Sequence, residues 1–250
     1  MNGAERFWEK ATRAPRGVYV VDFDIIPSST ALAIIDMQKY GCCRDIGLGP
    51  VYVRETPETA EYWFSRISEV AIPNIRNLLQ FFRKDKLRVI YICVGPLLPD
   101  ASDLSRRRRL RDQSRLKISG IDHFFSPGTL EHEIVDELKP NQGEMIFNKN
   151  TTSAFNSTNI DQILRNMGIE SLVITGIATS SCVESTARDA ADKGYNCILV
   201  EDACADKYPD SHKMTMINFA RAFGRVMITS EVVDHLESKL SSPPAQQANP

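Results

Sequence analysis

One cysteine lies where a nucleophile is expected. Cys182 belongs to the stretch Ser171–Asp189, whose pattern predicts a buried strand, a tight turn at Gly176 and then a helix. At the first turn of a helix, unpaired N–H groups and the positive end of the helix dipole favour a thiolate, so we expect a lowered pKa for this thiol. The alternative is an ordinary buried core cysteine. The position after a strand-to-helix turn, where open α/β sheets bind ligands, favours the nucleophile.

Two further charged residues follow predicted strands. Asp36 comes directly after an apolar run, and Lys149 ends the run EMIFN. A cysteine nucleophile needs a group that takes its proton and later protonates the leaving amine, which a carboxylate can do. A nearby cation is needed to hold a thiolate beside a carboxylate, and Lys149 supplies it. The alternative for each residue alone is a cap for Asp36 and an ordinary surface lysine for Lys149. Their shared position at strand ends favours the catalytic interpretation.

Six apolar, strand-like runs alternate with helical patterns along the chain. The predicted strands cover residues 31–35, 88–93, 144–148, 172–175, 195–200 and 225–229. This alternation predicts an α/β fold, a single-domain, Rossmann-like three-layer sandwich with a six-stranded, mainly parallel sheet and helices on both faces. The carboxyl ends of parallel strands lie along one edge of a sheet. Asp36, Lys149 and the Cys182 turn can therefore meet there.

The segments between these strands are less regular. Helical spacing predicts helices over residues 72–82, 130–138, 158–168, 182–194 and 211–223, and a last helix that ends near Leu240. Residues 37–66 show little periodicity, so we expect a long loop that walls the site. We expect an N-terminal arm over residues 1–29, the enzyme domain over 30–240 and a disordered tail over 241–250.

A run of arginines occupies the second long connection, residues 95–120. Arg106–Arg111 contains five arginines, and the first interpretation is a solvated helix face or a mobile loop. The alternative is a lid whose guanidinium groups bind an anionic substrate, because they match carboxylates in a bidentate fork.

Composition excludes several classes of protein. The 250 residues carry a net charge of −2, which disfavours a nucleic-acid partner, and no stretch approaches the roughly 20 apolar residues of a bilayer span. The N-terminus lacks the apolar core of a signal peptide, and the six cysteines lack C-x-x-C spacing. We therefore expect a cytoplasmic protein with reduced thiols, without membrane contact and without a cofactor.

Four segments together resemble one known superfamily. They are IIDMQ from Ile34, NKNTTSAF from Asn148, GIATSSCVESTARDA from Gly176 and EDAC from Glu201. In combination they resemble the isochorismatase-like cysteine hydrolases, over about residues 30–233. The resemblance implies cleavage of a C–N bond by a triad of Asp36, Lys149 and Cys182. It also implies a cis peptide bond between Ile177 and Ala178 and an oxyanion hole made by the N–H groups of Ala178 and Cys182.

Differences between this sequence and particular relatives reduce the number of expected activities. Nicotinamidases carry an Asp/His metal cluster, whereas residues 37–120 contain no histidine, so we expect no metal site and disfavour nicotinamide as the substrate. Isochorismatases lack the cysteine, and Cys182 argues against their reaction. The Cys182 motif most resembles ureidoacrylate amidohydrolases, among relatives that include N-carbamoylsarcosine amidases and biuret hydrolases. We expect a small linear amide or N-carbamoyl (ureido) substrate, hydrolysed through a thioester with release of ammonia.

Two alternatives and several secondary expectations stay open at this point. The alternatives are a carboxamide amidase similar to nicotinamidases and a catalytically silent binding protein on the same fold. Candidate substrate-binding residues are Gln38, Tyr40, Phe155, Arg107 and Arg111. Relatives are commonly homo-oligomers, so we expect a dimer or tetramer in which Phe7 and Trp8 of the arm pack on a neighbouring subunit.

Overall fold

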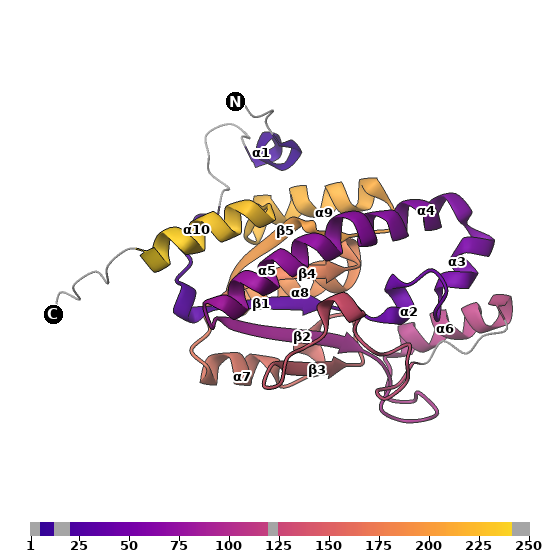
Figure 1. Cartoon of the computed structure of the whole chain (residues 1–250). Helices are drawn as coiled ribbons and strands as arrows, with labels where there is room; N and C mark the ends of the chain where they lie inside the picture. The colour runs from indigo at the N-terminus through magenta and orange to yellow at the C-terminus, as the bar shows by residue number, and fades with distance from the viewer. Residues whose placement is uncertain (1–5, 13–20, 120–124, 242–250) are drawn as a thin grey trace.

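The computed structural model describes residues 6–12, 21–119 and 125–241, and a six-stranded sheet forms its centre (Figure 1). The strand order is β3-β2-β1-β4-β5-β6, and all neighbouring strands are parallel. The strands are β1 (Thr30–Ile35), β2 (Arg88–Val94), β3 (Met145–Lys149), β4 (Ser171–Ile177), β5 (Asn196–Ala205) and β6 (Arg225–Met227). All six predicted strands are confirmed, although β5 continues beyond its predicted end at Val200.

Helices cover both faces of this sheet, which confirms the predicted single-domain, three-layer fold. One face packs against α5 (Ile72–Lys84) and α10 (Thr229–Ser241). The other packs against α7 (Ile160–Asn166), α8 (Glu184–Asp192) and α9 (Pro209–Ala222). The short helix α1 (Phe7–Thr12) lies on α9, and Trp8 is buried within its own chain. Trp8 thus packs against its own chain, and the expected contact of the arm with a neighbouring subunit stays a prediction.

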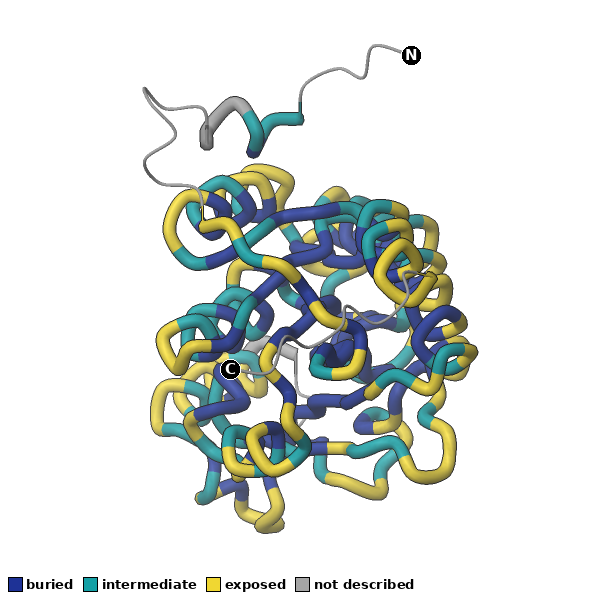
Figure 2. Tube along the Cα trace, turned by 90° about the vertical axis from the view of Figure 1, so that its left-hand side faces the viewer, coloured by how far each residue is buried: buried dark blue, intermediate teal, exposed yellow. Residues whose placement is uncertain are grey.

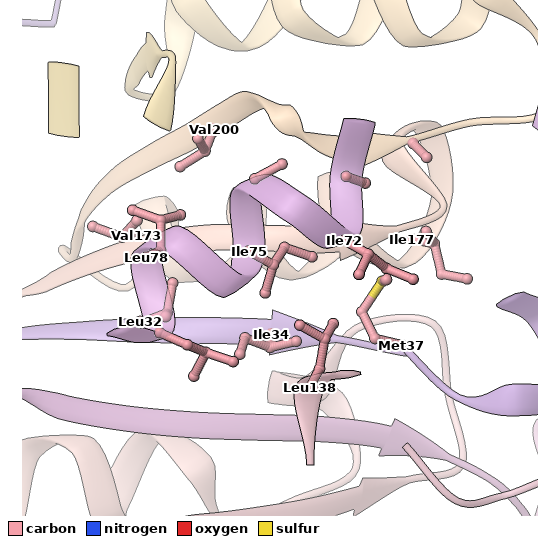
Figure 3. Packing of buried hydrophobic residues seen from close by; sticks show 14 of the residues in the cluster. Leu32, Ile34, Met37, Ile72, Ile75, Leu78, Leu138, Val173, Ile177 and Val200 are labelled. Carbon is pink, nitrogen blue, oxygen red and sulfur yellow. The ribbon is translucent and has the colours of Figure 1, made fainter. Parts of the chain in front are cut away.

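Alternation along β1 builds the two apolar layers. Leu32 and Ile34 face α5, whereas Ala31, Ala33 and Ile35 belong to the layer on the opposite face. Figure 3 shows the first layer, in which residues of α5 lie over β1, β4 and β5. Buried residues line the sheet and the inner sides of the helices, and exposed residues lie on the outside (Figure 2). Each fully buried Leu or Ile contributes about 1.5–3 kcal/mol, so these layers hold the strand ends in fixed positions.

The segment 37–66 is helical, and the prediction of a long irregular loop is wrong. It contains α2 (Lys39–Cys42), α3 (Gly49–Glu55) and α4 (Pro57–Ser65), and a π-helical segment, Arg66–Ala71, joins α4 to α5. Pro57 lies in the first turn of α4, where its missing N–H costs no hydrogen bond. Trp63 is buried and donates its indole N–H to the Gly41 carbonyl, 3.0 Å away. These helices are short, so they show too few turns to reveal a period.

Residues 130–138 do not form the predicted helix. Their backbone pairs with the segment that follows β1: Gln38 and Ile134 form an antiparallel bridge, and the Lys39 N–H donates to the Glu133 carbonyl at 2.8 Å. Only Asp136–Leu138 form a 3₁₀ turn; similar turns occur at Pro27–Ser29 and Ala154–Asn156. Long-range backbone pairing thus outweighs a local helical pattern.

The arginine run forms a helix, α6 (Arg106–Ser119), beside α2 and α3 in Figure 1. The run is expected to form either a helix face or a mobile loop, and the structure shows a helix. Across the described ranges, no helix has both the length and the apolar character needed to cross a bilayer. The expected tail after Ser241 lies outside the described residues.

Candidate active site

The candidate site lies where the strand order changes direction. β1 and β4 are neighbours at the centre of the sheet, and the chain leaves β1 toward β2 on one side and β4 toward β5 on the other. Ligands bind in open α/β sheets at the carboxyl ends of such a strand pair. Gly176 of β4 lies opposite Ile35 at this point, and a Cβ atom there would be 2.1 Å from the Ile35 carbonyl oxygen. Gly176 therefore allows the close approach of the two strands just before Asp36 and the Cys182 turn.

Three predicted catalytic side chains meet at this edge. The Lys149 Nζ atom lies 2.9 Å from Asp36 Oδ2 and 3.3 Å from Cys182 Sγ, so one ammonium group contacts both partners. Lys149 is fully buried and also approaches the Thr151 carbonyl at 3.4 Å. Asp36 is 3% exposed and has a φ of 53°, a left-handed conformation that Asp tolerates better than most residues. This conformation directly follows β1.

The electrostatic environment of the thiol differs from the expected one. Burial raises the pKa of Cys182, and the charge of Asp36 raises that pKa further, while the charges of Lys149 and Arg108 oppose the shift. The expectation of a lowered pKa is therefore wrong. Cys182 lies within a π-helical turn, Thr179–Val183, and regular α-helix begins only at Glu184. Desolvation beside a carboxylate thus outweighs the effect of the helix end, and burial and the carboxylate both favour the neutral thiol over the thiolate.

A protonated thiol needs a base within reach, and Asp36 has a free acceptor. Its Oδ2 atom accepts from Lys149, while its Oδ1 atom is buried and has no hydrogen-bond partner among the described residues. A buried carboxylate oxygen without a donor is costly, so its persistence here calls for a functional explanation.

The turn before Cys182 has the conformation that the resemblance implied. The peptide bond between Ile177 and Ala178 is cis. Ala178 and Cys182 line the same small cavity as Asp36. The two backbone N–H groups assigned to an oxyanion hole thus belong to residues on the wall of one chamber, and their role stays a prediction.

A buried polar network holds this turn from behind, and the sequence reasoning missed it. Thr179 Oγ1 lies 2.9 Å from His212 Nδ1, and His212 Nε2 lies 2.9 Å from Glu201 Oε1. Arg66 donates to the same Glu201 oxygen at 2.9 Å. A second anchor is the Ser180 N–H, which donates to Asp206 Oδ2 at 2.6 Å. The available signal was the polar stretch after Val200, which extends β5 toward the turn.

The cavity in front of the triad has a volume of about 110 Å³. Of the five candidate substrate-binding residues, Tyr40, Arg107 and Arg111 line it. Gln38 does not, because its buried amide accepts from the Val94 N–H at 2.8 Å and donates to the Val94 and His132 carbonyls. Phe155 does not either, because its ring packs against Tyr195 in the core, 5.8 Å between ring centres. Both residues support the fold around the site.

Positive charge surrounds the cavity beyond the residues predicted. Its lining also includes Arg108, Arg115 and Lys207. Arg107 donates to Thr152 Oγ1 at 2.5 Å, in the loop after Lys149. Asp112, which is 2% exposed, lies 3.1 Å from Arg115 and 3.4 Å from Arg111. The arginines of α6 are thus held against the site by one buried carboxylate, and cations outnumber anions around the cavity. Within residues 6–12, 21–119 and 125–241, no three His, Cys, Asp or Glu side chains group as metal ligands.

Comparisons with known proteins agree with this geometry. The isochorismatase domain family model matches residues 30–231. Ureidoacrylate amidohydrolase RutB of Agrobacterium fabrum is 31% identical over 218 residues, which cover 82% of this chain and 89% of the relative. RutB of Rhizobium rhizogenes is 30% identical over 217 residues, 82% of each chain.

Solved structures give the same picture. A cysteine hydrolase from Pseudomonas syringae pv. phaseolicola aligns with a TM-score of 0.71 and 28% identity, covering 88% of this chain and 98% of the other. N-carbamoylsarcosine amidase from Thermoplasma acidophilum aligns with a TM-score of 0.56 and 25% identity, covering 80% and 96%.

Proposed function

The chain belongs to the isochorismatase family and is a hydrolase acting on C–N bonds, and from this premise we propose that Cys182 attacks a small linear amide or N-carbamoyl acid. The observation that carries the proposal is the contact of one buried ammonium, Lys149 Nζ, with both Asp36 and Cys182. This arrangement supplies a nucleophile, a base and a compensating charge at one cavity. The carbamoyl acids named for the relatives fit that chemistry.

The first half of the reaction forms the covalent intermediate. Asp36 removes the proton from the Cys182 thiol as the sulfur adds to the carbonyl carbon. The N–H groups of Ala178 and Cys182 stabilise the resulting oxyanion, and Lys149 offsets the negative charge that builds up between sulfur and carboxylate. The C–N bond then breaks, and the protonated Asp36 gives its proton to the departing nitrogen, which leaves as ammonia. A carboxamide gives a thioester, and a ureido compound gives the corresponding thiocarbamate.

The second half regenerates the enzyme. Asp36, again a carboxylate, removes a proton from a water molecule that adds to the same carbon. The C–S bond breaks, and the thiolate recovers its proton from Asp36. The product is a carboxylic acid from an amide, or a carbamic acid from a ureido compound. Asp36 thus acts twice as base and twice as acid, and its buried Oδ1 atom, which has no hydrogen-bond partner among the described residues, supports this proposal.

The charge of the cavity supports an acidic substrate. Arg107, Arg111, Arg115 and Lys207 line it, and Asp36 is the carboxylate among its lining residues. Guanidinium groups bind carboxylates in a bidentate fork, so a ureido acid gains affinity that a neutral amide does not.

Ammonia release from a panel of substrates tests the proposal. The panel contains ureido acids, biuret, aliphatic carboxamides and nicotinamide, each assayed with the wild-type protein and with Cys182→Ala. We expect turnover of ureido acids above all others and none by the variant. Preference for nicotinamide or another neutral carboxamide would support the alternative carboxamide amidase. Absence of turnover throughout would support the silent binding protein.

A further inference from the structure

A second cavity adjoins the reactive one. It has a volume of about 210 Å³ and shares five lining residues with the first cavity: Leu48, Tyr52, Trp63, Arg115 and Lys207. The rest of its lining comes mostly from α3 and α4, with Val51 and Ala60 as apolar members. Tyr208, 56% exposed, lies at its rim. The reactive cavity is charged, whereas its larger neighbour is mainly apolar.

Lys207 lies on the boundary between the two cavities without an acidic partner. Its Nζ atom is 3.6 Å from the centre of the Tyr52 ring and 6.0 Å from that of Trp63. Among the described residues, no salt bridge joins this ammonium to a carboxylate, and Tyr52 is the group that favours its charged form. Burial lowers the pKa of Lys207, contact with Tyr52 opposes that shift, and the charges of Arg115 and Arg111 add to it. A partly buried cation beside other cations is destabilised unless an anion joins them.

Among the described residues near Lys207, the acidic side chains already have other partners. Asp112 already lies within 4 Å of Arg108, Arg111 and Arg115. Glu55, at the second cavity, is exposed and pairs with Arg54 at 2.7 Å. The anion that best complements Lys207 therefore belongs to a ligand.

We propose that the substrate spans both cavities, with its carbamoyl carbon at Cys182, its carboxylate at Lys207 and Arg115, and an apolar side chain in the second cavity. The chemical class that fits is an N-carbamoyl α-amino acid with an aromatic or branched aliphatic side chain. In such a molecule the carboxylate and the side chain leave the same carbon, one nitrogen away from the carbamoyl group. The cations Lys207 and Arg115 lie between the two cavities in the same way, with Cys182 on one side and the apolar cavity on the other. The placement of the reactive carbon rests on the proposed function.

Binding to a variant without the nucleophile tests this assignment. Isothermal titration of Cys182→Ala compares N-carbamoyl-L-phenylalanine with N-carbamoylglycine, which lacks the side chain. We expect the aromatic acid to bind about tenfold to a hundredfold more tightly, the range that an apolar pocket commonly gives. Equal dissociation constants for the two acids would overturn the proposal.

Two matched pairs of variants, made in the Cys182→Ala protein, test which cavity and which cation cause the difference in affinity. Thr59 lines only the second cavity, so Thr59→Phe fills that cavity and should abolish the preference for the aromatic acid, whereas Glu58→Phe on the exposed side of α4 should keep it. Lys207→Met should weaken both acids about tenfold, and Lys84→Met, at an exposed lysine of α5, should weaken neither. Thr59→Leu serves as a milder filling variant if the phenylalanine variant does not fold.

The outcomes separate this proposal from the proposed function. An unchanged preference in both filling variants, or unchanged affinity in Lys207→Met, would refute the two-cavity assignment whatever the enzyme turns over. If the preference is present but the wild-type protein releases no ammonia from either acid, the binding assignment stands and the proposed function fails.

Discussion

At the scale of single residues, the raised pKa of Cys182 has a direct consequence for reactivity. Burial and the charge of Asp36 both disfavour the thiolate, so the thiolate fraction should become large only above the pH at which an ordinary cysteine ionises. We predict that the rate of Cys182 alkylation by iodoacetamide keeps rising beyond pH 9, with a midpoint above that of free cysteine. Peptide mass spectrometry measures the alkylation rate of Cys182 separately from that of the other cysteines. A rate that levels off by pH 7 would contradict the assignment.

Asp36 has two opposing effects on the same sulfur, and a single substitution separates them. Asp36→Asn removes the proton acceptor and should lower kcat by about 10²- to 10⁴-fold. It also removes a negative charge that raises the Cys182 pKa, so alkylation by iodoacetamide at pH 7 should become faster. Ammonia assays and alkylation rates on one preparation provide the measurement. If both rates fall together, the substitution has disturbed the fold and not only the base.

At the scale of elements, the turn between β4 and α8 depends on α9 and β5. His212 of α9 lies between Thr179 of the turn and Glu201 of β5. His212→Phe removes both contacts, and we predict a fall in kcat of about tenfold with little change in KM, because in the proposed mechanism the turn supplies the nucleophile and the oxyanion donors. His212→Gln, which can keep one hydrogen bond, should recover part of the loss.

The control for this positioning role is His235→Phe. His235 lies on α10, away from the candidate site, and pairs with Asp24. Its substitution should leave kcat and KM unchanged. Thermal unfolding of each variant measures its cost in stability, which for the buried hydrogen bonds of His212 should be about 1–3 kcal/mol. A fall in kcat that follows stability alone, without recovery in the glutamine variant, would argue for a purely structural His212.

Helix α6 gives a prediction about substrate charge. Arg107 and Arg111 line the cavity, whereas Arg106 is exposed and does not. The double change of Arg107 and Arg111 to Met should raise KM for a ureido acid about tenfold and have little effect on a neutral carboxamide. Arg106→Met is the matched control. An equal rise in KM for the acid and for the neutral amide would indicate that Arg106–Arg111 is only a solvated helix face.

At the scale of the whole molecule, the strand order explains how residues more than a hundred positions apart form one site. β1 and β4 are adjacent at the reversal of the sheet, and β3 brings Lys149 to the same edge. These features could be predicted from the sequence, because buried parallel strands are continuous apolar runs and their carboxyl ends share an edge. Asp36, Lys149 and Cys182 were identified in this way.

Other parts of the site depend on contacts that local sequence does not encode. Gln38 is a predicted substrate-binding residue, but its amide is held by the backbone of β2. The segment 130–138 has a helical period and is nevertheless paired with residues 37–40. Lys207 and Trp63 carry no motif, and only the contact between β5 and the segment Arg66–Ala71, which continues α4, brings them to one cavity. The expected homo-oligomer and the absence of a cofactor stay predictions.

The central claim is that Cys182 becomes covalently attached to the substrate carbon. Mass spectrometry of protein quenched with acid during turnover of a ureido acid tests it most directly, with Cys182→Ala as control. We predict a mass increase equal to the substrate minus ammonia, located by digestion on the peptide that contains Cys182 and absent from the variant. Turnover by the wild-type protein with an unmodified Cys182, or turnover by the alanine variant within tenfold of wild type, would contradict the account.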